Sequence, residues 1–208
     1  MFNDLSSPLS LLRTRRSGRP RDLVAPGPSA DELRQILAIA MRTPDHGKLH
    51  PWRFVHVAAG QRDALAGLLV SAYRAEHPDA GRIEIEAAER FAHQAPELVV
   101  VLSSPTPGHK IPVWEQELSC GAAMMNLQLA AHAHGFVSGL VTGWAAYSAT
   151  VLAAFGAPPE RIAGFIFIGT PGSELEERLR PEFGEVASEW APPPGSAGGA
   201  DLTWTSPK

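Results

Sequence analysis

The sequence contains a single cysteine, Cys120, among its 208 residues. One cysteine excludes an internal disulfide and suits a reducing compartment. Cys120 lies within an apolar helical stretch, so we expect an inert, buried thiol. The first residues show no basic segment followed by an apolar run, and no window approaches the roughly 18 apolar residues that a membrane-spanning helix needs. These absences predict a soluble, cytoplasmic protein.

Several catalytic and nucleotide-binding motifs are also missing. No GxGxxG follows a predicted strand, and neither a GxxxxGK[ST] phosphate loop nor a GxSxG nucleophile elbow occurs. His46 and His50 bracket a loop, and His132 and His134 alternate across a predicted helix, so neither pair predicts a metal site. We expect His132 or His134 to be a cation that faces the negative end of that helix. No pair of carboxylates stands out as a general acid and base.

Positive charge is scarce overall but locally concentrated. The chain has 18 Lys and Arg against 22 Asp and Glu, a formal net charge of -4, which argues against general nucleic-acid binding. Five arginines nevertheless fall between Arg13 and Arg21. Guanidinium groups and the hydroxyl of Ser17 are donors suited to phosphate oxygens. The alternative is that these arginines only complement the negative end of a helix dipole.

A second cationic stretch is Met41 to Phe54, MRTPDHGKLHPWRF, between a predicted helix and a predicted strand. Arg42 and His46 emerge just after the helix, because Pro44 disfavours helical geometry at Thr43. A short connection with so many cations and imidazoles is typical of a loop that a rigid scaffold holds against a ligand. The alternative is a solvated loop that happens to contain two histidines.

Apolar periodicity and turn residues predict a domain of alternating helices and strands. A capping box, Ser29 with Glu32, begins one helix. The unbroken apolar run Leu98–Leu102 predicts a strand that is buried on both faces. The longest predicted helix has apolar residues on several sides and is expected to be central. We predict helices at about 4–16, 30–42, 60–75, 80–93, 113–134 and 148–154, and strands at 52–58, 98–102, 137–141 and 165–168.

The chain shows no internal repeat and no domain linker before residue 172. From about 172 the composition becomes polar, and from 191 a segment rich in Pro, Gly and Ala is typical of disorder. We therefore predict one domain over residues 1–190, with a C-terminal arm from about 172, followed by a disordered tail at 191–208.

Taken together, these motifs resemble the FMN-dependent nitroreductase family, and within it the small cytoplasmic NAD(P)H nitroreductases. The resemblance covers about residues 8–190. Each motif is weak alone, but five in matching order and spacing are specific. The stretches that carry the resemblance are Arg15-Arg16-Ser17, Met41-Arg42-Thr43-Pro44-Asp45-His46, Pro51-Trp52, Trp114-Glu115-Gln116-Glu117 and Gly169-Thr170-Pro171.

The resemblance implies an α+β fold in which helices flank a mixed sheet. It also implies an intertwined homodimer, with FMN at the subunit interface and in contact with both chains. By position, the implied cofactor-binding residues are Arg15, Arg16 and Ser17 at the phosphate and ribityl chain, Arg42 and His46 from the other subunit, Leu140, Val141 and Thr142 beside the isoalloxazine ring, and Arg180 at the phosphate.

The implied activity is that of an oxidoreductase, which takes hydride from NAD(P)H and reduces electron-poor acceptors, such as nitroaromatics or quinones, by a ping-pong cycle. The flavin performs this chemistry, so no catalytic side chain is expected. There is one departure from the family pattern. Related sequences often carry a Trp-Arg-Ser type segment where this chain has Leu140-Val141-Thr142, which leaves a flavin-binding carrier or sensor with little turnover as an alternative. A second alternative is an interaction protein that binds phosphate through the arginines between Arg13 and Arg21.

Overall fold

The computed structural model describes residues 2–191, which divide into two units between Leu175 and Glu176. The boundary lies a few residues beyond the predicted start of the C-terminal arm. The second unit contains one short helix, α8 (Phe183–Val186). Of the predicted disordered tail, residues 192–208 lie outside the described residues. Within residues 2–191, no helix is both long enough and apolar enough to cross a bilayer.

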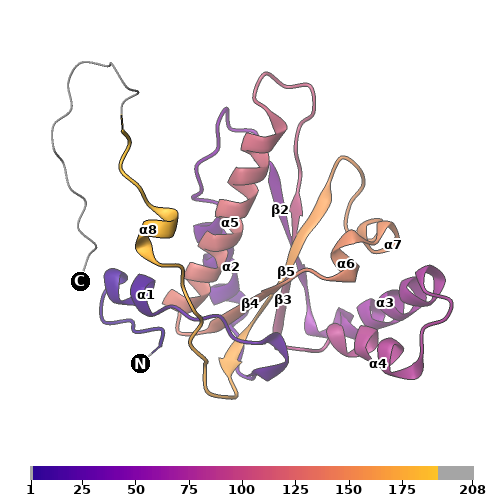
Figure 1. Cartoon of the computed structure of the whole chain (residues 1–208). Helices are drawn as coiled ribbons and strands as arrows, with labels where there is room; N and C mark the ends of the chain where they lie inside the picture. The colour runs from indigo at the N-terminus through magenta and orange to yellow at the C-terminus, as the bar shows by residue number, and fades with distance from the viewer. Residues whose placement is uncertain (1, 192–208) are drawn as a thin grey trace. The chain divides into compact units, whose positions relative to one another are not determined.

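The first unit is built from helices and one five-stranded sheet (Figure 1). Its strands are β1 (Leu23–Val24), β2 (Trp52–Val57), β3 (Glu97–Ser103), β4 (Val137–Val141) and β5 (Arg161–Pro171). Its helices are α1 (Pro8–Thr14), α2 (Ala30–Ala40), α3 (Arg62–Glu76), α4 (Arg82–Phe91), α5 (Val113–Ala133), α6 (Trp144–Tyr147) and α7 (Ala149–Leu152), with 3-10 turns η1 (Pro20–Asp22) and η2 (Ala59–Gln61).

The strand β5 is the centre of the sheet. It pairs with β1, β3 and β4, and β3 pairs with β2 on its other side. The α+β class and the flanking helices are confirmed. The expected mixed sheet is corrected for this single chain: every strand pair among the described residues is antiparallel, because β5 runs opposite to β1, β3 and β4, and β3 runs opposite to β2.

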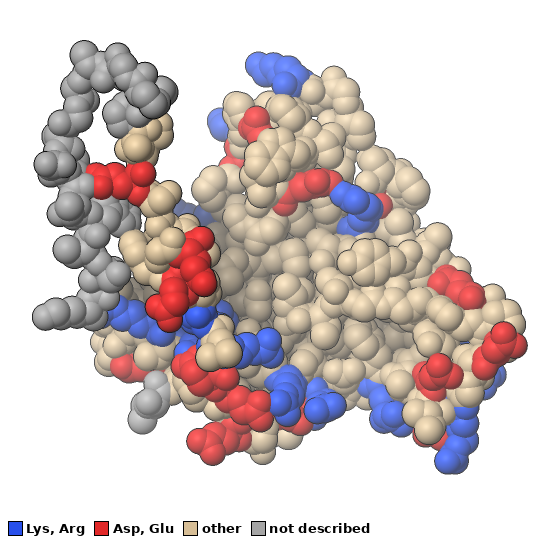
Figure 2. Space-filling model, viewed as in Figure 1, with Lys and Arg blue, Asp and Glu red and all other residues tan. Residues whose placement is uncertain are grey.

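One face of the sheet is covered by α2 and α5. Val99 and Val101 of β3 point to this face, where they join a core with Ile36 and Leu127. The opposite side of α5 is different, because Trp114 is 64% exposed and Leu118 and Met125 are exposed as well. Figure 2 shows that the centre of the face turned to the viewer, where α5, β4 and α6 lie in Figure 1, is mostly uncharged. The expectation of a central helix therefore holds on one side of α5 only.

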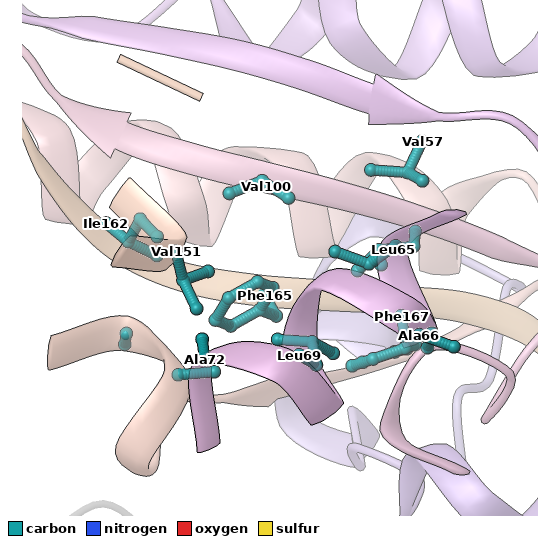
Figure 3. Packing of buried hydrophobic residues seen from close by; sticks show 14 of the residues in the cluster. Val57, Leu65, Ala66, Leu69, Ala72, Val100, Val151, Ile162, Phe165 and Phe167 are labelled. Atoms are coloured by element: carbon teal, nitrogen blue, oxygen red, sulfur yellow. The ribbon is translucent and has the colours of Figure 1, made fainter. Parts of the chain in front are cut away.

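The other face of the sheet packs against α3, α4, α6 and α7 (Figure 3). Leu98, Val100 and Leu102 of β3 point here, each with 0% exposure. The ring of Phe91 meets the ring of Phe165 edge to face, with the centroids 5.0 Å apart. Because Val99 and Val101 are equally buried on the opposite face, the prediction of a strand buried on both sides is confirmed.

Capping side chains decide where several helices begin. Both hydrogen bonds of the predicted capping box are present, since Ser29 Oγ accepts from the Glu32 N–H and Glu32 accepts from the Ser29 N–H. The first helix is shorter than the predicted 4–16, because Ser7 caps it and it begins at Pro8. The predicted helix at 148–154 is wrong in its bounds. Ser148 has an extended backbone and caps α7, so it separates α6 from α7.

Candidate functional site

The segment Arg15 to Ser17 leaves α1 as an ordered loop, because Arg15 already has a non-helical backbone (φ -57°, ψ 128°). The Arg15 guanidinium donates to Ser17 Oγ at 3.1 Å, which places these two side chains on one side of the loop. Arg16 is only 9% exposed, and its Nη1 donates to the Arg15 carbonyl at 2.7 Å. The predicted phosphate residues therefore form one compact group of donors.

This loop packs directly against β4. The Gly18 N–H donates to the Ser138 carbonyl at 3.1 Å. Gly139 has no room for a side chain, since a Cβ there would lie 2.5 Å from the carbonyl oxygen of Gly18. The structure thus brings the Arg15–Ser17 loop to the same strand that ends in Leu140–Thr142, the segment predicted to lie beside the flavin ring.

The end of β4 is accessible. Leu140 is 41% exposed, Val141 is half-buried and Thr142 is exposed. Gly143 follows at φ 69°, a left-handed conformation that favours glycine, and the chain then turns into α6. Among the described strands β4 pairs with β5 alone. Its second edge therefore offers backbone groups between residues 140 and 142 that a planar ligand can reach.

His132 lies near the junction between the loop and β4, and it is not the cation that the sequence predicted. The ring is fully buried, and its Nε2 accepts a hydrogen bond from the Ser138 N–H at 3.1 Å. Burial, and then the nearby charge of Arg15, lower the pKa of His132 to about 4. For His132 the prediction is wrong, because the ring points into the core and not toward solvent at the helix end; for His134 it stays a prediction. The ring of His132 therefore fixes the backbone of Ser138, whose carbonyl in turn accepts the hydrogen bond from the Gly18 N–H.

The second cationic segment, from Arg42 to His50, runs along α5. Asn126 Nδ2 donates to Thr43 Oγ1 at 2.8 Å, near the middle of the helix. His46 Nδ1 lies 2.8 Å from a carboxylate oxygen of Glu115, at the beginning of the helix. These two contacts orient the segment antiparallel to α5. Arg42 and His46 are both exposed.

The backbone of this segment is held by its own side chains. Asp45 accepts hydrogen bonds from the N–H groups of Leu49, at 3.1 Å, and His50, at 2.8 Å. Gly47, Lys48 and His50 all have positive φ, which costs about 1 kcal/mol or more for each residue other than glycine. A loop that keeps two such residues is ordered, which favours the interpretation as a ligand-binding loop over that of a loosely solvated connection.

His46 and the Arg15–Ser17 loop do not meet within one chain. His46 contacts Glu115 at the N-terminal end of α5, whereas the Arg15–Ser17 loop is connected through Gly18 and Ser138 to His132 at the C-terminal end. Glu115 and His132 are 17 residues apart on this helix, which corresponds to about 25 Å at the usual rise of 1.5 Å per residue. A single chain therefore cannot present His46 and the Arg15–Ser17 loop to the same small ligand.

A cavity of about 250 Å³ lies beside Thr142, between α3, α4 and the turn into α6. Glu76 links α3 to this turn, because it accepts hydrogen bonds from Trp144 Nε1 at 2.7 Å and from Ser148 Oγ at 2.6 Å. The bond from Ser148 is the largest cause that lowers the pKa of Glu76. The ring of Tyr73 meets Trp144 edge to face at 4.8 Å. Sequence reasoning missed this network, because its members are about 70 residues apart and form no local motif.

The chemistry of the donor set suits a phosphate group. The Arg15–Ser17 loop presents two guanidinium groups and a hydroxyl, which are donors suited to phosphate oxygens. Across residues 2–191, no three His, Cys, Asp or Glu side chains are grouped as a metal site. Arg180 lies in the second unit, and its contact with the phosphate stays a prediction.

Similarity to known proteins extends over most of the chain. Residues 12–170 match the model of the nitroreductase family. A Haemophilus influenzae protein, provisionally named an NAD(P)H nitroreductase, is 40% identical over 172 residues, which are 82% of this chain and 91% of that protein.

Solved structures show the same fold. A nitroreductase-like family protein from Bacillus cereus superposes with a TM-score of 0.73 at 23% identity, covering 88% of this chain and 95% of that one. A Desulfovibrio desulfuricans protein, provisionally named a nitroreductase and solved in complex with FMN, gives a TM-score of 0.67 at 22% identity, covering 90% and 99%. On the sequence match and the shared fold, the chain belongs to the nitroreductase family.

Proposed function

We propose that this protein is an FMN-dependent oxidoreductase, which takes hydride from NAD(P)H and reduces electron-poor acceptors such as nitroaromatics or quinones. Given the membership of the family, one observation above all supports this function. The Arg15–Ser17 loop, rich in phosphate donors, is packed onto the strand whose accessible end is Leu140–Thr142. A ligand with a phosphate at one end and a planar ring at the other matches that arrangement.

In this proposal each segment has a separate task. Arg15, Arg16 and Ser17 bind the phosphate, and each charged hydrogen bond contributes about 1.5–3 kcal/mol. The exposed edge of β4 at Leu140–Thr142 orients the ring through backbone groups. When bound, FMN supplies the redox chemistry, accepting hydride from NAD(P)H and reducing the acceptor in a second step. The protein then needs no catalytic acid, base or nucleophile of its own.

We further propose that the active unit is a homodimer formed through α5. The exposed side of this helix carries Trp114, Leu118, Gly121 and Met125 at spacings of four, three and four residues, the pattern of a helix–helix seam. Among residues 2–191, nothing outside the helix's own neighbouring turns lies within 4 Å of a Cβ built on Gly121, so a second helix could approach closely there. An exposed apolar stripe of this kind marks an association surface.

Two-fold symmetry would account for the positions of His46 and the Arg15–Ser17 loop at opposite ends of α5. A symmetric pair of α5 helices packed antiparallel sets the N-terminal end of one beside the C-terminal end of the other. The partner subunit's Arg42 and the partner's His46 would then approach the Arg15–Ser17 loop. Each of the two sites would be completed by the other chain.

The remaining assignments follow the same proposal. Arg180 in the C-terminal arm, which begins at about 172, adds a further phosphate contact. Burial raises the pKa of the Cys120 thiol to about 11, so it stays protonated and unreactive. A single, unreactive thiol agrees with the proposed cytoplasmic location.

The visible spectrum of the purified protein tests the proposal. Protein incubated with FMN and freed of excess flavin should be yellow, and anaerobic NADPH or NADH should bleach it. Colourless protein that takes up no FMN would contradict the proposal. Bound FMN that neither nicotinamide reduces would instead support the carrier or sensor, which the replacement of a Trp-Arg-Ser type segment by Leu140-Val141-Thr142 favours.

A further inference from the structure

The residues before α1 fold back onto the loop that holds Arg16. Asn3 Oδ1 accepts a hydrogen bond from the backbone N–H of Arg16 at 2.8 Å, and Asn3 Nδ2 donates to the Arg16 carbonyl at 3.4 Å. The backbone N–H of Asn3 donates to the Thr14 carbonyl at 3.1 Å. The Asp4 N–H donates to Thr14 Oγ1 at 2.9 Å. One asparagine therefore binds both backbone polar groups of Arg16.

This arrangement needs an asparagine at position 3. A side-chain amide carries both a donor and an acceptor, so it can pair with the N–H and the C=O of the same residue. Asn3 also has φ 54°, a left-handed conformation that asparagine tolerates better than most residues. The ring of Phe2 adds a second contact, 4.9 Å from the Arg16 guanidinium carbon. These residues precede positions 12–170, which match the family model.

The loop is thus held at two points. Asn3 holds the backbone at Arg16, and the hydrogen bond to Ser138 holds it at Gly18. Arg15 and Ser17 lie beside the first of these points, and their side chains are already hydrogen-bonded to each other. Donors that are fixed before the ligand arrives lose less conformational entropy when it binds.

We propose that Asn3 is a positioning residue for the phosphate-binding loop: it holds the Arg16 backbone so that Arg15 and Ser17 are presented together to the phosphate of the flavin. This inference rests on the proposed function. It predicts that the loss of Asn3 weakens the binding of a flavin that carries a phosphate and spares a flavin that lacks one.

Asn3→Gly is the sharpest test, because glycine removes the amide and accepts the positive φ without strain. Dissociation constants for FMN and riboflavin are measured by quenching of flavin fluorescence on the full chain. We expect the FMN constant to rise about tenfold, the scale of one to two lost hydrogen bonds. The riboflavin constant should change by less than about twofold. Equal weakening of both flavins, or no change in either, would overturn the inference.

Two further variants sharpen the result. Ser6→Ala changes the same segment at a hydroxyl that donates to Asp4 at 3.0 Å, and it should leave the ratio of the two constants unchanged. Asn3→Asp tolerates the positive φ and keeps the acceptor for the Arg16 N–H, but it loses the donor to the Arg16 carbonyl. It should weaken FMN selectively, which keeps the test decisive if Asn3→Gly does not fold, and an unchanged ratio in folded Asn3→Asp would then overturn the inference. Wild-type protein that binds FMN and riboflavin equally would contradict the phosphate site itself.

Discussion

The close approach of the phosphate-binding loop to β4 depends on Gly139, and Gly139→Ala tests this directly. The added methyl group would lie 2.5 Å from the Gly18 carbonyl oxygen and 3.0 Å from Cγ and Cδ of Pro20. Ordinary non-bonded contacts lie near 3.5 Å, so the loop must move by roughly 0.5–1 Å. The nearest atom belongs to the backbone, so a change of side-chain rotamer cannot relieve the clash.

The size of the effect follows from two opposing terms. Overpacking of this kind costs about 1–3 kcal/mol, while replacing a strand glycine by alanine returns about 0.5–1 kcal/mol. We expect a net loss of about 1–2 kcal/mol in the free energy of unfolding, measured by urea denaturation. FMN binding should weaken as well, because the displaced loop loses the hydrogen bond from Gly18 to Ser138.

Gly67→Ala is the matched control. Gly67 lies inside α3, and in the part of the chain that the structure describes nothing beyond the adjoining turns of the helix lies within 4 Å of a Cβ built there. The same substitution should stabilise the protein there by about 0.5–1 kcal/mol and leave flavin binding unchanged. If Gly139→Ala were as stable as the wild type and bound FMN equally well, the loop could not be packed against β4 as described.

Three further predictions concern other parts of the molecule. Leu118→Asp places a charge in the proposed α5 interface, so we expect a folded monomer by light scattering, with weaker flavin binding; a flavin-loaded dimer would exclude this interface. Arg62 is 4% exposed and donates to three backbone carbonyls, so Arg62→Met should lose about 3 kcal/mol in urea denaturation, and a loss below about 1 kcal/mol would refute this role. The pKa of His132, about 4, lies below its usual 6.5, so the unfolded chain takes up this proton first as the pH falls. The contribution of His132 to the free energy of unfolding is therefore fully present above pH 6.5 and falls by up to about 3 kcal/mol as the pH approaches 4. His132→Gln should lack this decrease in unfolding curves recorded across that range.

The features that were predicted correctly from the sequence each depend on a short stretch of chain. The capping box of Ser29 and Glu32 needs only four residues. The run Leu98–Leu102 has no polar position, so no register of that strand could place a face in water. The Arg15–Ser17 and Leu140–Thr142 segments were assigned through resemblance to a family, which places residues by position and leaves their contacts undetermined.

The features that could not be predicted depend on contacts between distant parts of the chain. Glu115 lies in the first turn of α5, but its contact with His46 spans 69 residues. The charge of His132 depends on whether the end of α5 faces solvent or the core, and helical periodicity does not reveal that at a helix terminus. The role of Asn3 could not be predicted either, because its partner, Arg16, follows 13 residues later in the sequence, beyond α1.

The separation of His46 from the Arg15–Ser17 loop along α5 has a thermodynamic consequence in the proposed dimer. If the partner subunit's His46 and the Arg15–Ser17 loop complete one site, FMN binds the dimer better than the monomer. A ligand that prefers one state stabilises it by RT ln(1 + [L]/Kd), about 2.7 kcal/mol at a hundredfold excess over Kd. The linkage is reciprocal, so dissociation of the dimer must weaken flavin binding by the same factor. Dimer dissociation measured with and without FMN therefore tests the shared site without any substitution, and identical constants would show that each chain binds its flavin alone.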